Sequence, residues 1–137
     1  MHTGWIIILA AACLLTAGAE VLRRRRLSPW YARGCAGRAW KKRFPDATAT
    51  EIRRFLSVFA DGFLLKKRHR LKFFPDDSIN EIYKAIYPFG GPDAMEYEIL
   101  FLELDKLYNR EIPVESFNER LTLGELFSAA RASSDKK

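Results

Sequence analysis

The chain has 137 residues and a formal net charge of +6 at pH 7, which leaves room for one ordinary domain and a small additional element. The charge is polarised: residues 1–73 carry 16 Lys/Arg against 4 Asp/Glu, whereas residues 74–130 carry 4 against 12. The two cysteines and two histidines fit neither a disulfide framework nor a metal-binding spacing. We therefore expect no metal, a basic half that faces anionic lipid, and an acidic half that forms a soluble domain.

Residues 4–22 are apolar apart from Thr16 and Glu20, and a stretch of about 19 residues is just long enough to cross a bilayer core. Four arginines follow and predict that the remainder of the chain lies in the cytoplasm. Residues 1–26 are thus interpreted as a membrane anchor, with these residues at the two interfaces: Trp5, Arg23, Arg24, Arg25 and Arg26.

A cleaved signal peptide is the alternative interpretation of the same run. Ala17-Gly18-Ala19 has the small side chains of a cleavage site. No Lys or Arg precedes the apolar residues, however, and the arginines that follow would hinder export. Glu20 near the end of the run is tolerable, because it can reach the interface or pair with an arginine one helical turn further on.

Residues 27–46 are basic and aromatic, which predicts a juxtamembrane segment between the anchor and the soluble domain. Pro29 suits the start of a helix. Trp30, Tyr31 and Trp40 suit a helix lying on an anionic headgroup layer, although a solvated basic linker has the same composition.

Residues 47–131 show helical periodicity and no strand pattern, so the predicted fold is all-α. Helices are expected from Thr48 or Thr50 to about 65, over 79–87, over 94–110 and from Thr122 onward, with a disordered tail at 132–137. The expected buried positions are Ile52, Phe55, Leu56, Phe59, Phe63, Leu64, Ile79, Ile82, Tyr83, Ile86, Met95, Ile99, Leu102, Leu104, Leu107, Leu123, Leu126 and Phe127, and Tyr97, Leu100, Phe101 and Tyr108 widen the apolar face of the helix over 94–110.

Polar residues in the chain give no catalytic set, so we expect no enzyme activity. His69 lies in the basic run 66–70 and has no nucleophilic partner nearby in the sequence. That run is expected to be a solvated helix end close to the membrane, because nucleic-acid binding would require interleaved aromatic residues and a recognised fold.

The order of motifs from residue 93 onward resembles the second half of an acyl carrier protein. The shared features are Asp93-Ala94-Met95 opening a long helix, Ile112-Pro113 ending it, and Thr122-Leu123 starting the last helix. The resemblance covers about residues 47–130. It implies a four-helix carrier bundle, here with one extra short helix over 79–87.

In that family the position of Ala94 is a serine that carries 4'-phosphopantetheine. Ala94 has no hydroxyl, so the resemblance implies a member without a cofactor at the usual site. Asp77-Ser78-Ile79 repeats the Asp-Ser-apolar pattern and leaves open an attachment at Ser78. The other interpretation is that Ser78 only caps the short helix.

The resemblance also implies a function, since carrier domains are recognised by partners through an acidic helix. We expect a docking or regulatory module on the cytoplasmic face of the bacterial inner membrane, bound by a protein with a basic patch. The expected partner-binding residues are Asp93, Glu96, Glu98, Glu103 and Asp105. The alternatives are a true carrier modified at Ser78, and a structural protein whose acidic domain self-associates or folds back on its basic stretch.

Overall fold

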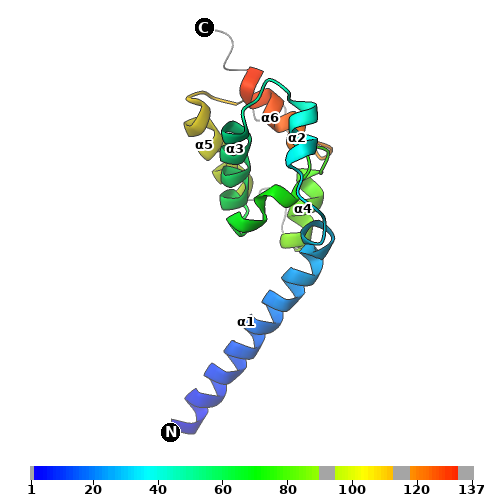
Figure 1. The fold of residues 1–137 in the computed structure, drawn as a ribbon. Coiled ribbons are helices and arrows are strands. Elements are labelled where there is room, and N and C mark those ends of the chain that lie inside the picture. Colours follow the sequence, from blue (N-terminus) through cyan, green and yellow to red (C-terminus); the bar gives the residue numbers. More distant parts are fainter. Residues whose placement is uncertain (1, 90–94, 113–117, 133–137) are drawn as a thin grey trace.

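The computed structural model describes residues 2–89, 95–112 and 118–132, and these residues contain helices and no strand. Figure 1 shows one long helix, α1 (His2–Tyr31), projecting from a bundle of shorter helices. The bundle elements are α2 (Gly37–Arg43), α3 (Ala49–Gly62), the 3-10 helix η1 (Lys67–Lys72), α4 (Ile79–Ile86), α5 (Met95–Tyr108) and α6 (Leu123–Ala132). The all-α prediction is confirmed.

The N-terminal part of α1 has the length and composition of a membrane span, although a signal sequence passes the same test. Its side chains are exposed along the whole apolar stretch, and Leu14 and Leu15 are each 75% exposed. Glu20 pairs with Arg24 at 3.2 Å, as expected for residues one turn apart. One long apolar N-terminal helix is therefore confirmed.

α1 does not end at the arginines but continues to Tyr31, and Pro29 lies inside its last turn rather than at a helix start. A proline this close to the end removes only one backbone donor. The carbonyl just before the proline is used, because Ala32 N–H donates to Ser28 O at 3.0 Å.

Residues 27–46 are part of the bundle rather than a separate juxtamembrane segment. Leu27, Ala36 and Phe44 are buried, and the side chain of Trp40 has no exposed surface. The indole Nε1 of Trp40 donates to the carbonyl of Phe73 at 2.8 Å. The prediction that Trp40 lies on the headgroup layer is therefore wrong, because the ring fills the core.

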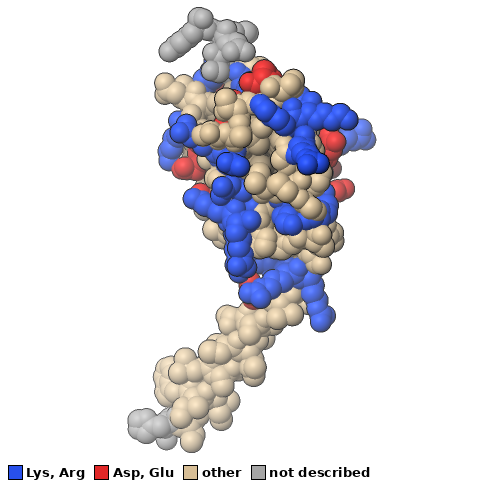
Figure 2. Space-filling view, viewed as in Figure 1, with Lys and Arg blue, Asp and Glu red and all other residues tan. Residues whose placement is uncertain are grey.

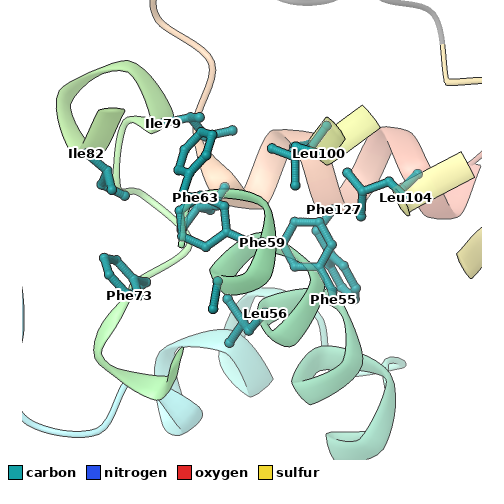
Figure 3. Close-up of a cluster of buried hydrophobic side chains, with 14 of the residues drawn as sticks. Phe55, Leu56, Phe59, Phe63, Phe73, Ile79, Ile82, Leu100, Leu104 and Phe127 are labelled. Carbon is teal, nitrogen blue, oxygen red and sulfur yellow. The ribbon is translucent and has the colours of Figure 1, made fainter. Parts of the chain in front are cut away.

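The core is built around α3, whose inward face carries Phe55, Leu56 and Phe59, and Phe63 at the C-cap of this helix is buried with them. Figure 3 shows these side chains packed against residues from four later segments of the chain. They are Phe73 after η1, Ile79 and Ile82 of α4, Leu100 and Leu104 of α5, and Phe127 of α6. The predicted face of α3 is confirmed except at Leu64, which lies beyond the helix. Leu64 has φ 55° and is 69% exposed.

The helix starts follow the expected capping residues. Thr48 Oγ1 accepts from Glu51 N–H at 3.1 Å, and Ser78 Oγ accepts from Glu81 N–H at 3.3 Å. At α6 the two halves of a capping box are formed, because Glu125 N–H donates to Thr122 and Glu125 accepts from Thr122 N–H. These local bonds explain why the helix starts can be predicted from the sequence.

The starts of α4 and α6 are joined by backbone. Ile79 N–H donates to Leu121 O at 3.1 Å, and Leu123 N–H donates to Asp77 O at 3.0 Å. Gly124 then comes so close to Pro75 that an added Cβ would lie 2.9 Å from the Pro75 carbonyl oxygen. This connection fixes the relative position of two helices that are far apart in the chain.

Candidate functional site

The outer side of α5 is the most distinctive surface of the bundle. Leu100, Phe101 and Leu104 are the buried residues of this helix. Met95, Ile99 and Leu102 follow one another at spacings of four and three, so they share the opposite side, and they are 69%, 43% and 58% exposed. We call these three residues the apolar stripe.

The prediction that the apolar stripe is buried is wrong for all three residues. α5 is apolar on two sides, and periodicity alone does not say which side packs inward. The side with Tyr97, Phe101 and Tyr108 packs on the core, since aromatic rings bury more surface than Met, Ile or Leu.

Acidic residues lie along both edges of the apolar stripe rather than on one continuous face. Helical spacing puts Glu96 and Glu103 on one edge and Glu98 and Asp105 on the other. Glu98 is exposed and Glu96 partly exposed. The fifth predicted partner-binding residue, Asp93, and the carrier position Ala94 lie outside the described residues.

Two of the four described acids have partners within the fold. Asp105 Oδ1 accepts from Ile112 N–H at 2.8 Å and so holds the chain that leaves α5. Glu103 pairs with Lys106 at 2.7 Å. Among the described acids of α5, Glu96 and Glu98 are therefore the ones best suited to contact a partner.

Aromatic rings fill the space between α3, α4 and α5. The Tyr83 ring lies 4.8 Å from that of Tyr97, and the Phe63 ring lies 5.5 Å from Tyr97. Burial raises the pKa of both tyrosines above the usual value of 10.0. The extra helix α4 thus packs against the start of α5 through tyrosine rings.

Ser78 has a defined structural role at the start of α4. Its hydroxyl caps the helix, and its backbone forms a bridge with Thr122. The neighbouring Asp77 accepts from Phe74 N–H at 2.6 Å and is paired with Arg33. The predicted cap is confirmed.

The predicted membrane residues separate into two groups. Trp5 is 71% exposed on the apolar part of α1, and Arg24, Arg25 and Arg26 are exposed further along that helix. Trp30 and Tyr31 are partly buried against the core. No local pattern predicts this packing, because the rings that contact Tyr31, those of His69 and Phe73, follow about 40 residues later in the chain.

The prediction that His69 is a solvated side chain is wrong. Its ring stacks on Tyr31 with the ring centroids 4.1 Å apart, and its Nε2 accepts from Arg68 Nε at 3.1 Å. Burial and the charges of Arg68, Lys66 and Lys72 lower the pKa of His69 below its usual value of 6.5. No group of three metal-ligating side chains occurs within the described ranges.

The two cysteines, Cys13 and Cys35, are both exposed and free. Comparison with protein-family models, with curated proteins and with solved structures gives no match for this chain.

Proposed function

We propose that this protein is a membrane-anchored, acyl-carrier-like helical domain that acts as a non-catalytic docking module on the cytoplasmic face of the bacterial inner membrane. α1 is the anchor, and the outer side of α5 is the docking surface. The observation that carries the proposal is the exposed apolar stripe of Met95, Ile99 and Leu102 with Glu96 and Glu98 at its edges.

An apolar centre with a charged border is a common arrangement for a protein interface. Contact with a partner would remove the stripe from water, and burying apolar area is the main favourable term in association. The acidic border favours a partner whose own apolar patch is surrounded by Lys or Arg, and it would steer the encounter with that partner.

The membrane anchor is supported by the length and position of the uncharged part of α1. Residues 3–22 contain one charged side chain, Glu20, and at about 1.5 Å per residue they extend about 30 Å. That length matches a hydrocarbon core of about 30 Å. Figure 2 shows the lower part of α1 free of Lys and Arg, which begin where the helix meets the bundle and continue over the visible face of the bundle.

Extraction of membranes at alkaline pH, followed by intact-mass measurement, tests the anchor. A retained anchor stays with the membrane and has the mass of all 137 residues. A mature protein shortened near Ala17-Gly18-Ala19 would instead identify a signal sequence.

The proposal of a domain that carries no acyl group rests on three observations. Ala94 has no hydroxyl for a phosphopantetheine ester, and the Ser78 hydroxyl already accepts a hydrogen bond from Glu81 N–H. The Tyr83 ring of α4 also packs on Tyr97 near the start of α5, where the carrier resemblance implies that an acyl chain would enter.

The alternative function, a carrier modified at Ser78, is distinguished from the docking module by the intact mass of the protein. The full chain is co-expressed with a broad-specificity phosphopantetheinyl transferase, and we expect no added mass. A gain of one phosphopantetheine that disappears in Ser78→Ala would replace the docking module with a displaced carrier.

The docking surface is tested by a photoreactive amino acid placed at Leu102, with the exposed Ser128 of α6 as the control position. We expect one discrete adduct in cells from position 102 and none from 128, and we expect Glu98→Lys to reduce it. Glu119→Lys, an equal charge change at an exposed site, should leave the adduct intact. An adduct with a second copy of this chain would favour the structural alternative.

A further inference from the structure

A cleft of about 230 Å³ lies where α1 meets the bundle. Its α1 wall includes Arg23, Arg24 and Tyr31, and its opposite wall is the turn from Leu64 into η1, with Lys66 and Arg68. The side chains that form it thus come from segments about 40 residues apart, which the fold brings together.

The cleft carries an excess of positive charge. Four Lys/Arg side chains line it against a single carboxylate, that of Glu20. Glu20 is already shared between Arg24 at 3.2 Å and Arg23 at 4.0 Å. Within the described part of the chain neither Lys66 nor Arg68 has an ion-pair partner, so the charge on this wall is not compensated.

The side chain of Arg23 is held in place within the cleft by the backbone of the opposite wall. Its guanidinium donates to the carbonyl of Leu64, and its Nε is buried without a hydrogen-bond partner among the described residues. A buried donor without a partner costs free energy, so this end of the cleft is short of acceptor groups.

The position of the cleft along α1 indicates which anion can reach it. Arg23 follows directly after the stretch of about 30 Å that matches a bilayer core, so the cleft lies at headgroup depth. Leu64, on the lining, adopts the left-handed region that only glycine enters easily, and it exposes 69% of its side chain to solvent. An exposed leucine beside cations suits a ligand with a charged head and apolar tails.

We propose that this cleft binds the phosphate of one anionic phospholipid from the leaflet into which the arginine end of α1 emerges. This inference rests on α1 being the membrane anchor proposed above. The guanidinium groups of Arg23 and Arg68 and the ammonium group of Lys66 bind the phosphate oxygens. The acyl chains extend along the apolar surface of α1.

The test uses the full chain in neutral detergent with phosphatidylglycerol or phosphatidylcholine added, and bound lipid is counted by native mass spectrometry. Arg23 is left unchanged because it packs within the fold. The exposed pair is replaced instead, as Lys66→Gln with Arg68→Gln. Arg38→Gln with Lys42→Gln removes the same charge from exposed positions of α2 and is the control.

We expect one retained phosphatidylglycerol, no retained phosphatidylcholine, and affinity lowered tenfold or more in the Lys66/Arg68 variant alone. Equal losses in both variants would indicate diffuse charge attraction and overturn the site. His69 supplies a second readout on the cleft wall, since a bound anion should raise its imidazole pKa in NMR titrations.

Glycerol 3-phosphate distinguishes a lipid from a soluble phosphate. An equal response of His69 to this compound would assign the cleft to soluble phosphates and overturn the lipid proposal. Alkaline membrane extraction tests the anchor separately. A protein that stays in the membrane but shows no selective lipid retention would retain the proposed anchor and lose only the lipid site.

Discussion

Arg33 and Asp77, 44 residues apart in the chain, form a two-point ion pair that connects the end of α1 to the turn before α4. The two guanidinium nitrogens of Arg33 lie 2.9 and 2.6 Å from the two carboxylate oxygens of Asp77. Arg33 also donates to the Lys72 carbonyl at 3.0 Å, and Asp77 accepts from Phe74 N–H. One arginine therefore joins the end of α1 to Asp77 and to the Lys72 carbonyl, and Asp77 extends the connection to the backbone of Phe74.

Replacing Arg33 with lysine should destabilise the fold although the charge is kept. Lysine cannot make both bonds to Asp77 and the bond to Lys72 at once. Loss of these part-buried contacts should lower the free energy of unfolding by about 1–3 kcal/mol. Arg38→Lys, at an exposed site, is the control. Urea unfolding followed by circular dichroism measures both, and equal midpoints would contradict the role of the pair.

Gly124→Ala should also lower stability, because the space for a methyl group is already occupied. An added Cβ would lie 2.9 Å from the carbonyl oxygen and 3.0 Å from the Cβ of Pro75. Moving these atoms apart would strain the Gly124 N–H to Pro75 O bond, now 2.7 Å long, and should cost about 1–3 kcal/mol. Gly34→Ala, with nothing within 4 Å of the added Cβ, should have little effect.

Substitutions on the two sides of α5 should differ in how much stability they cost. Leu102 is 58% exposed and Leu104 fully buried, so they separate interface from core. Leu102→Ser should change stability by no more than about 0.5 kcal/mol, while Leu104→Ala should cost about 2–5 kcal/mol. Thermal unfolding of the two variants is the measurement. A large loss in Leu102→Ser would mean that the apolar stripe is covered within this chain.

Alkaline pH should destabilise the fold through Tyr108. Burial, with a smaller contribution from Glu51, raises the pKa of Tyr108 to about 12. The neutral form is therefore favoured in the folded state. The resulting stability is fully present below pH 10, the unfolded pKa, and is lost as pH rises towards 12. Tyr108→Phe should show a smaller fall in urea midpoint between pH 9 and pH 11.5 than the unsubstituted protein. An identical fall would assign the alkaline loss to other groups.

Tryptophan fluorescence should distinguish core from membrane positions. In the Trp5→Phe/Trp30→Phe protein, Trp40 is the sole tryptophan, and it should emit at short wavelength and escape quenching by lipids with brominated acyl chains. The Trp30→Phe/Trp40→Phe protein, which keeps Trp5 alone, should be quenched if α1 spans the bilayer. Quenching of Trp40 would contradict its place in the core.

The features predicted correctly from sequence are those set by neighbours in the chain. The caps at Thr48 and Ser78 and the capping box of Thr122 and Glu125 each need residues only three apart. The burial of Trp40 depends instead on Phe73 and Phe127, and composition alone places an aromatic residue among cations at a membrane surface. The exposed side of α5 was mispredicted for the same reason, because α5 is apolar on two sides and either side could have packed on α3.

The candidate docking surface was predicted only in part for the same reason. Glu96 and Glu98 could be identified from the sequence as acidic residues on a helix, whereas the apolar stripe between them emerges only when Leu100, Phe101 and Leu104 are seen to face inward. The basic cleft had no sequence signal beyond its two separate runs of cations, at 23–26 and 66–70.

The unbroken passage of α1 into the bundle has a mechanical consequence. Leu27 lies within the same helix as the apolar stretch and is buried in the core, so no flexible tether separates anchor and bundle. With α1 in a bilayer, the continuous helix holds α5 at a fixed height and tilt above the lipid. A partner would then have to present its patch at that height, which favours neighbours diffusing in the same plane over proteins arriving from solution.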